Sequence, residues 1–319
     1  MIYIACPAYN ATGGTELLHQ LFYHLNIEGV DVRIIYTNIV WYKPFSITHS
    51  KFEKYGVKRA WRIIDNKSNL LITAETNVDI LLKYSRIEKI VWWLSVNNYF
   101  NAKYKTKVNT IDFKLDDSEI KFFKSLKFNL VQSYYAKSLL FEFGIKNNVQ
   151  FLSDYINEDY LINSENITCS NKRENVILYN PMKGLDVLSP IIRSLNNYKW
   201  IPLINLTNEQ LSKLFLTSKL YIDFGPHPGK DRLPREACFL GCCIITNKKG
   251  SAMYEEDVCI PEKYKIDNPS NSIDYIDTLI ESIFSDFEKN SNMYSEYRDK
   301  INFEKKLFLK ELKELFYAE

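Results

Sequence analysis

The sequence predicts an α/β protein built from two doubly wound domains, and three observations support this prediction. The chain has 319 residues, which is too long for one ordinary domain and suits two of about 150. Short apolar segments alternate with amphipathic segments, a pattern typical of parallel sheets covered by helices on both faces. Residues 157–175 are polar and interrupt this alternation once. The chain therefore divides into two halves, each with its own sheet.

The first half, residues 1–156, is predicted to be the N-terminal domain. Unbroken apolar runs indicate buried strands, and apolar residues that recur every three or four positions indicate helices. On this basis the predicted strands are 1–7, 31–37, 69–75, 89–96 and 128–133. The predicted helices are 15–26, 78–87 and 134–144, and Gly144 ends the last of them.

After a linker at 157–175, residues 176–290 are predicted to form the second domain. Its predicted strands are 175–180, 200–206, 219–224 and 242–246. Its predicted helices are 185–197, 208–218 and 234–241, and the chain is expected to be helical from Ser272 onward. Residues 291–319 include a strongly amphipathic stretch, which we expect to form a C-terminal helix that packs back on the N-terminal domain.

The composition is that of a soluble globular protein, with 46% hydrophobic and 25% charged residues. No apolar run approaches the roughly 20 residues that a membrane-spanning helix needs. No basic region precedes the first strand as it would in a signal peptide. The six cysteines lack paired spacing and are expected to be reduced thiols. Together these features predict a cytoplasmic protein.

Charge is unevenly distributed along the chain, which concerns partners rather than fold. Residues 1–150 contain 20 Lys and Arg against 13 Asp and Glu, whereas residues 151–319 contain 21 against 26. Cations attract anionic lipid headgroups at about 1 kcal/mol each, and aromatic rings settle at the lipid interface. A cluster of basic and aromatic residues within residues 41–67 predicts docking on the inner membrane leaflet. The alternative is an ordinary solvated face whose aromatic residues belong to the core. The members of the cluster are Trp41, Tyr42, Lys43, Phe45, Lys51, Phe52, Lys54, Tyr55, Lys58, Arg59, Trp61, Arg62 and Lys67.

Ligands of open parallel sheets bind at the carboxyl ends of the strands, so residues that follow each strand are the most informative. Gly13 and Gly14 follow the first strand and would let the backbone approach a ligand closely. The N–H groups at the start of the next helix would then face an anion. The alternative is a plain turn in which Thr15 caps the helix and Glu16 favours its dipole. A nicotinamide-binding unit is not expected, because the G-x-G-x-x-G pattern does not occur here.

The stretch 223–236, DFGPHPGKDRLPRE, is the segment richest in chemistry. Its glycines Gly225 and Gly229 and its cations Lys230 and Arg232 lead into a predicted helix, and such a loop suits a diphosphate. The spacing is one residue short of a P-loop, and Asp231 stands where that motif needs Ser or Thr, so an ATPase is not expected. A solvated loop is the structural alternative.

A lysine also follows the first strand of the second half. Lys183 lies in the sequence NPMKG directly after the predicted strand 175–180. At that sheet edge it would point at the same diphosphate. An ordinary surface lysine explains the residue equally well.

The run GPHPGKDRLPREACFLGCCIITNKKGSA resembles the donor-binding segment of GT-B glycosyltransferases. The stretch GGTELLHQL and the KG at 183–184 resemble the same group. The stretches WWLSVNNY and LVQSYYAK…FLSDYIN are similar to a subset of it that acts on bacterial surface polysaccharides, such as capsule, O-antigen or lipopolysaccharide. The resemblance covers nearly the whole chain in order. It implies two Rossmann-like domains with a cleft between them and transfer of a sugar, of the hexosyltransferase kind, from a nucleotide diphosphate donor to a glycan or lipid-linked acceptor.

The resemblance also assigns roles to individual residues. It implies that Glu236 holds the nucleotide ribose, while Lys183 with Lys230 or Arg232 neutralises the departing diphosphate. The large retaining group of the family has a glutamate eight positions before this one, whereas this chain has Pro228 there. His227 beside it is a candidate substitute. The predicted donor-binding residues are Gly13, Gly14, Lys183, Gly225, His227, Gly229, Glu236 and Ser251.

Neither a cofactor nor a metal is expected. The metal-chelating Asp-x-Asp pair of the other glycosyltransferase fold does not occur, because Asp112, Asp116 and Asp117 have the wrong spacing. In GT-B enzymes, cations and a helix dipole take the place of a metal. The expected partners are therefore a nucleotide sugar and an acceptor, with no nucleic acid.

The first half is expected to hold the acceptor. Glu75 or Glu16 could act as the general base if the reaction inverts, with helix capping and loop hydrogen bonding as their alternatives. At least one of Trp92 and Trp93 is core, since the two alternate across a strand. The predicted acceptor-binding residues are Tyr9, Asn10, Trp93 and Asn98.

Two other functions stay open at this point. One is a different enzyme on the same double fold, such as a nucleotide-sugar epimerase. A glycan phosphorylase would need a pyridoxal-binding lysine site, and no such site is recognisable in the sequence. The other is a non-catalytic sugar-binding protein with a degenerate site.

Overall fold

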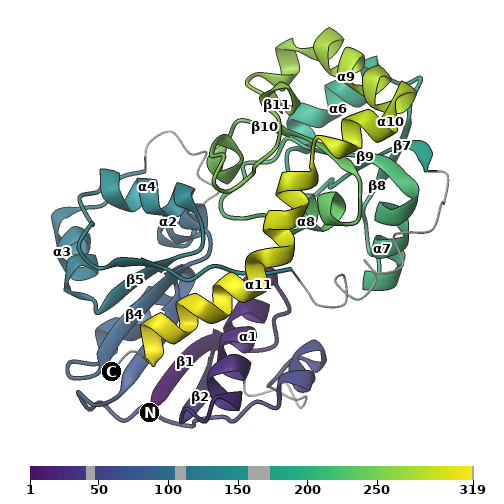
Figure 1. Ribbon diagram of the computed structural model, residues 1–319. Coiled ribbons are helices and arrows are strands. Elements are labelled where there is room, and N and C mark those ends of the chain that lie inside the picture. Colours follow the sequence, from purple (N-terminus) through teal and green to yellow (C-terminus); the bar gives the residue numbers. More distant parts are fainter. Residues whose placement is uncertain (41–46, 105–112, 157–172, 318–319) are drawn as a thin grey trace. The chain divides into compact units, whose positions relative to one another are not determined.

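The computed structural model describes residues 1–40, 47–104, 113–156 and 173–317. Two compact units make up the chain. The first contains Met1–Asp154 together with Leu309–Glu319, and the second contains Tyr155–Phe308. Each unit has its own parallel sheet with helices packed on it, as Figure 1 shows. The predicted α/β class with two doubly wound halves is confirmed.

The sheet of the first unit has six parallel strands in the order β2-β1-β3-β4-β5-β6. The chain leaves β1 for β2 on one side and returns to pair β3 on the other, with Ile2 opposite both Val32 and Leu70. The strand order therefore reverses between β1 and β3, which is where ligands of such sheets bind. The strands are β1 Ile2–Pro7, β2 Val32–Thr37, β3 Leu70–Ala74, β4 Glu88–Trp93, β5 Phe128–Val131 and β6 Val149–Phe151.

Helices connect these strands and bury their apolar faces against the sheet. One predicted helix, 78–87, differs: it is a 3₁₀-helix that spans Glu75–Lys83 and is broken at Asn77, where φ is −130°. The connection is short, and a 3₁₀-helix rises further per residue than an α-helix, so it reaches the start of β4 with fewer residues. The helices are α1 Gly13–Ile27, η1 Ser50–Tyr55, η2 Glu75–Lys83, α2 Val96–Tyr104, α3 Asp117–Ser125 and α4 Tyr134–Glu142.

The sheet of the second unit has five parallel strands in the order β11-β10-β9-β7-β8. Its order reverses between β7 and β9, so the carboxyl ends of these two strands mark its expected ligand site. Strands β9 and β10 are almost wholly buried, and β7 is buried over Val176–Leu178, as expected for strands covered on both faces. The strands are β7 Glu174–Tyr179, β8 Lys199–Pro202, β9 Ser218–Asp223, β10 Cys243–Asn247 and β11 Lys265–Ile266.

The helices of the second unit follow the predicted alternation. Helix α8 begins at Arg232 rather than Pro234, so Glu236 lies beyond its first turn. None of the described helices is both long and apolar enough to cross a membrane. The helices are α6 Leu185–Ser194, α7 Asn208–Thr217, α8 Arg232–Phe239, η5 Gly250–Met253, η6 Glu262–Tyr264, η7 Pro269–Asn271, α9 Ile273–Ser285, α10 Phe287–Asn292 and α11 Ser295–Phe316.

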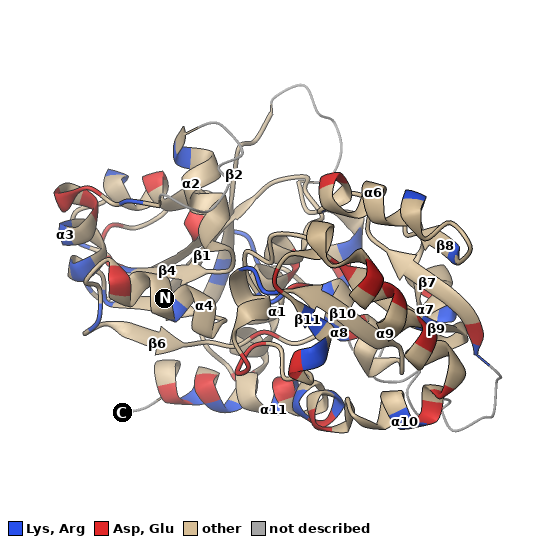
Figure 2. Ribbon diagram, turned by 90° about the horizontal axis from the view of Figure 1, so that it is seen from above, with Lys and Arg blue, Asp and Glu red and all other residues tan. Residues whose placement is uncertain are grey.

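The C-terminal helix α11 contributes to both units, because residues up to Phe308 belong to the second and residues from Leu309 to the first. Acidic and basic residues alternate along its exposed side (Figure 2). Its buried residues recur at helical spacing and are Tyr297, Ile301, Glu304, Phe308 and Leu312. One carboxylate therefore lies on an otherwise apolar stripe.

Candidate functional site

Three loops meet at the carboxyl edge of the second sheet. They follow β7, β9 and β10, and they approach each other closely enough that glycine is required. A Cβ on Gly184, whose φ is +67°, would lie 2.6 Å from the Phe224 backbone. A Cβ on Gly250, whose φ is +52°, would collide with the His227 carbonyl oxygen. Backbone packing of this kind fixes the loops relative to one another at the point where the strand order reverses.

A charge network that includes the buried His227 joins the first two of these loops. The Lys183 Nζ lies 2.5 Å from Asp231 Oδ1, and His227 Nδ1 lies 3.3 Å from the other Asp231 oxygen. Burial lowers the pKa of Lys183 and of His227, but the facing carboxylates outweigh it, so both pKa values are raised above their usual range. Burial raises the pKa of Asp231, but Lys183 and His227 outweigh that effect and lower it well below its usual value. The network therefore favours the charged form of all three groups.

The side chains of Asp223, His227 and Asp231 also have the chemistry of a divalent metal site. Their ligand atoms all lie within 4.8 Å of one another, and carboxylates with an imidazole bind transition metals. However, the Lys183 ammonium already contacts Asp231, and His227 Nε2 lies 3.2 Å from the Asp223 carbonyl oxygen. A metal ion here would displace these partners. The prediction of a metal-free site stays a prediction, which chelation can test.

Lys230, a predicted diphosphate ligand, is directed toward helix α11. Its Nζ lies 2.9 Å from Glu304 Oε1, and its side chain is only 8% exposed. The other Glu304 oxygen lies 2.8 Å from Arg235 Nη1, and Arg235 also donates to the Lys230 carbonyl oxygen. Glu304 thus pairs with two cations of the segment 223–236, Lys230 and Arg235. Lys230 would have to leave Glu304 to reach a diphosphate.

Arg232 and Glu236 lie one turn apart on helix α8. The Arg232 Nε is 3.6 Å from Glu236 Oε1, with the arginine side chain 22% exposed and the glutamate buried. The Lys183 side chain is more accessible, at 36%. Among the cations predicted for this site, Lys183 and Arg232 are therefore the two that solvent reaches most easily.

Four predicted donor-binding residues, Gly225, His227, Gly229 and Ser251, take part in hydrogen bonds that hold the loops together. The fully buried Ser251 hydroxyl donates to the Gly229 carbonyl oxygen at 2.7 Å, and Asn247 Nδ2 donates to the Gly225 carbonyl oxygen at 2.8 Å. The amide of Ser251 donates to the His227 carbonyl oxygen, and His227 has a left-handed φ of 42°. Because the Ser251 side chain is not exposed to solvent, it does not contact a donor directly in this structure.

At the carboxyl edge of the first sheet, the two glycines open helix α1. The expected cap is corrected: Thr12, not Thr15, is the N-cap, and the two threonines form a capping box. Glu16 lies in the first turn, where its carboxylate accepts a 3.4 Å hydrogen bond from the Tyr55 hydroxyl. The N–H groups of Gly13 and Gly14 are in the first turn, where a helix leaves its N–H groups without intrahelical acceptors.

The predicted acceptor residues beside them differ in accessibility. Tyr9 adopts a left-handed φ of 64°, and its hydroxyl donates to the Val40 carbonyl oxygen at 3.4 Å. Asn10 and Asn98 are exposed. Trp93 is fully buried, and its indole N–H donates to Asn129 at 3.0 Å. Trp93 is thus a core residue, and its assignment to acceptor binding is corrected.

Glu75 is buried at the carboxyl end of β3. Its Oε2 accepts a 2.9 Å hydrogen bond from the Leu94 N–H. Burial raises the pKa of Glu75 to about 7, although backbone N–H groups oppose the shift. A carboxyl group with a pKa in this range can exchange a proton at neutral pH, as a general base must.

Sequence reasoning did not assign Asp223, Asp231, Arg235 or Glu304 to the site. Glu304 could have been found, because it lies at the spacing of the apolar residues Ile301 and Phe308. A charged residue on such a stripe must be paired when the helix packs. The pairing of Asp231 with Lys183 joins loops 48 positions apart in sequence, and no local pattern reveals it.

Comparison with known proteins identifies the fold. No protein family model and no curated protein sequence matches the chain. Among solved structures, a glycosyltransferase from Rickettsia africae ESF-5 is similar, with a TM-score of 0.66, 14% identity, and coverage of 100% of this chain and 99% of that one. Sucrose-phosphate synthase from Thermosynechococcus elongatus has a TM-score of 0.68 and 13% identity, with coverage of 99% and 98%. WaaG, a glycosyltransferase involved in lipopolysaccharide biosynthesis, has a TM-score of 0.55 and 11% identity, with coverage of 100% of both chains. The chain therefore has the GT-B fold, as predicted.

Proposed function

We propose that this protein is a glycosyltransferase that moves a sugar from a nucleotide diphosphate donor to a glycan or lipid-linked acceptor. The observation that carries the proposal is at the carboxyl edge of the second sheet, where its strand order reverses. Lys183 there contacts Asp231, which directly precedes the helix on which Arg232 pairs with Glu236. That is the place where open α/β sheets bind nucleotides. Cations and a buried carboxylate that could accept ribose hydroxyls lie together there.

The roles of these groups follow from their chemistry. Glu236 would accept hydrogen bonds from the ribose hydroxyls. Lys183 and Arg232 would face the diphosphate and stabilise the charge that grows on it as it leaves, without a metal ion. Lys183 is suited to this role because Asp231 raises its pKa and so keeps it charged. The first unit would then hold the acceptor, with Glu75 or Glu16 as general base if the reaction inverts.

We further propose that the acceptor belongs to bacterial surface polysaccharide synthesis. The sequence resemblance supports this proposal, and so does the likeness in fold to WaaG, whose role is in lipopolysaccharide biosynthesis. The transferred group would be a hexose, as in the family that the donor loop resembles.

The proposal is tested by incubation with a panel of nucleotide sugars. Release of nucleoside diphosphate that requires an acceptor would support transfer, whereas isomerisation of the donor without an acceptor would indicate an epimerase. Calorimetry with the nucleoside diphosphate should show binding to the wild type and none to Glu236→Ala. Unchanged affinity in this variant would refute the role of Glu236. Activity should survive EDTA, and its loss would refute the metal-free mechanism.

We also propose that the enzyme docks on the anionic lipid of the inner leaflet through residues 41–67, of which the structure describes 47–67. Trp61 is 79% exposed, with the Arg59 guanidinium 5.5 Å from its ring and Arg62 exposed beside it. An exposed tryptophan next to cations suits a lipid interface. The other predicted members Trp41, Tyr42, Lys43 and Phe45 lie outside the described residues.

Flotation with anionic vesicles tests this docking. Wild type should float at low salt, and Trp61→Ala with Arg59→Glu and Arg62→Glu should not. Lys310→Glu, on the exposed side of α11, is a matched charge control that should float as wild type does. Failure of the wild type to float at low salt would refute the lipid-binding surface and leave the transferase proposal intact.

A further inference from the structure

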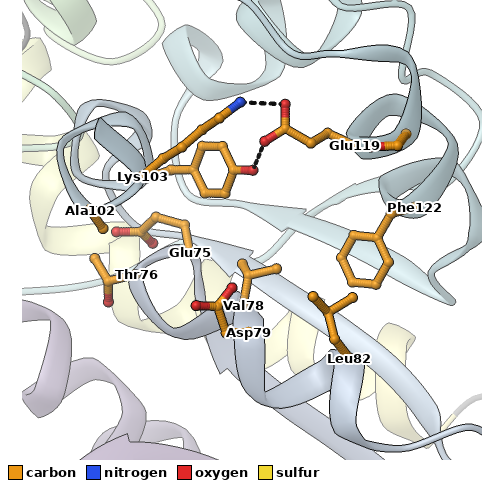
Figure 3. Close-up of a pocket in the computed structure, with 11 residues that line it drawn as sticks. Glu75, Thr76, Val78, Asp79, Leu82, Ala102, Lys103, Glu119 and Phe122 are labelled. Carbon is orange, nitrogen blue, oxygen red and sulfur yellow. Dashed lines mark hydrogen bonds and ion pairs between the residues drawn. The ribbon is translucent and has the colours of Figure 1, made fainter. Parts of the chain in front are cut away.

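The first unit contains a cavity that the donor site does not use. It has a volume of about 540 Å³ and lies between η2, α2 and α3 (Figure 3). This volume is within the range of about 300–1,000 Å³ that small-molecule sites occupy. Glu75 lines it, so the cavity begins at the carboxyl end of β3.

One end of the cavity is apolar. Val78 and Leu82 of η2 face Phe122 of α3 there, as Figure 3 shows. The Leu82 side chain is exposed, although a leucine in this unit could have packed against the core. An aromatic ring beside an aliphatic wall suits the C–H face of a sugar ring, which is apolar.

The other end is polar and held in place. The carboxylate of Glu119 accepts hydrogen bonds of 2.6 Å from the Tyr99 hydroxyl and from Lys103 Nζ, and one of 2.8 Å from the Asp116 N–H. A carboxylate fixed by three donors is preorganised, and its remaining lone pairs can accept from hydroxyl groups of a ligand. The arrangement thus combines an apolar face with directed polar groups.

The charge of the lining limits what can enter. Three carboxyl groups, on Glu75, Asp79 and Glu119, face the cavity, whereas Lys103 is its one basic lining residue among those described. An anionic ligand would meet net like charge, which raises the energy of its complex. Because burial raises the pKa of Glu75 to about 7, this group is partly protonated at neutral pH and can also donate a hydrogen bond.

We propose that this cavity binds an uncharged sugar ring of the acceptor and rejects uronic acids and phosphorylated sugars. The preference for a neutral sugar rests on the lining alone. The statement that this sugar belongs to the acceptor rests on the proposed transferase function. A lipid diphosphate attached to such an acceptor would have to bind elsewhere.

The proposal is tested by ligand-observed NMR with two matched probes, methyl glucopyranoside and methyl glucuronide, which differ by a carboxylate. The glucoside should bind, and the glucuronide about tenfold more weakly. Ala102→Trp, at an exposed position on α2, should fill the cavity and abolish binding of the glucoside. Asp79→Lys, also exposed, should reverse the preference. Ile27→Ala removes an exposed apolar side chain outside the cavity and should bind as wild type does.

The outcomes separate this proposal from the transferase function. Equal binding of both probes, or glucoside binding that survives Ala102→Trp, would overturn it. If neither probe binds while the nucleoside diphosphate binds normally, the cavity proposal fails and the donor site stands. If the glucoside binds as expected and no nucleotide does, the sugar site stands and the transferase proposal fails. Circular dichroism spectra of all the variants must match wild type for the comparison to count.

Discussion

At the carboxyl edge of the second sheet, charged side chains from neighbouring loops are paired with one another, as Lys183 is with Asp231. At the corresponding edge of the first sheet, the buried Glu75 is held by a backbone N–H group instead. The second edge therefore keeps its groups charged, whereas the first raises the pKa of a carboxyl group to about 7, so that the group is partly protonated at neutral pH. The edge of the second sheet therefore suits an anionic ligand. The edge of the first sheet suits hydroxyl groups and proton exchange.

The largest effect is expected from Glu304→Ala, which removes the carboxylate that Lys230 and Arg235 share. Two buried cations would lose the carboxylate that they share, so the free energy of unfolding should fall by about 3–5 kcal/mol. Urea denaturation measures it. The matched control is Glu314→Ala on the same helix, whose side chain is 63% exposed and 3.7 Å from Lys310. That variant should change stability by at most about 1 kcal/mol, and equal losses would contradict the buried ion triad.

The second prediction concerns the pH dependence of stability at Glu75. Folding raises its pKa from 4.5 to about 7, so the folded state binds the proton more tightly than the unfolded state. The contribution of Glu75 to the free energy of unfolding is on the order of 3 kcal/mol. It is fully present below pH 4.5 and is lost as pH rises through about 7. Glu75→Gln keeps an acceptor for the Leu94 N–H but does not titrate. Unfolding free energies of the two proteins should converge at low pH and diverge above neutrality, and parallel curves would refute the assignment.

Gly250→Ala tests whether the loops of the second edge depend on their close approach. A left-handed alanine costs about 1–2 kcal/mol, and the collision with His227 should add about 1–3 kcal/mol. Gly29→Ala is the control, because Gly29 has a φ of +84° with no atom within 4 Å of the added Cβ. Thermal unfolding compares the two variants. If both lose the same stability, the three loops are not as tightly packed as described.

The smallest effect is expected on the turnover number, and it distinguishes the roles of Lys230 and Arg232. If Arg232 stabilises the leaving diphosphate as proposed, Arg232→Ala should lower kcat about tenfold, which corresponds to about 1.4 kcal/mol. Lys230→Ala should mainly lower stability, because Lys230 is paired with Glu304. Steady-state kinetics on folded protein distinguishes them. A larger loss of kcat in Lys230→Ala would show that Lys230 leaves Glu304 during the reaction.

Most strands and helices could be predicted from the sequence, because their apolar spacing is a local property. The strands at 1–7 and 219–224 were predicted to within a residue of β1 and β9. The segment 78–87 was predicted to be a helix, and the structure has a 3₁₀-helix over Glu75–Lys83. Apolar spacing alone does not give the type or the bounds of such a helix.

The positions of the candidate site residues were predicted better than their contacts. Lys183 and Glu236 lie at the predicted sheet edge, since parallel strands bring their carboxyl ends together. The direction of Lys230 toward Glu304 depends on the packing of a residue 74 positions further along the chain. Trp93 could not be distinguished from Trp92, because the two faces of a strand covered on both sides are equally apolar. Contacts of this kind depend on tertiary packing.

Helix α11 has a consequence for the order in which the protein can be made. The first unit begins at Met1, yet it also includes Leu309–Glu319. Within that unit, Glu311 accepts hydrogen bonds of 2.6 Å from the Ser153 N–H and 3.1 Å from its hydroxyl. A ribosome delivers the chain from its N-terminus, and domains generally fold in that order. Here the unit that emerges first also needs Leu309–Glu319, which emerge after the whole of Tyr155–Phe308, so the first unit completes its fold only after the second has been made.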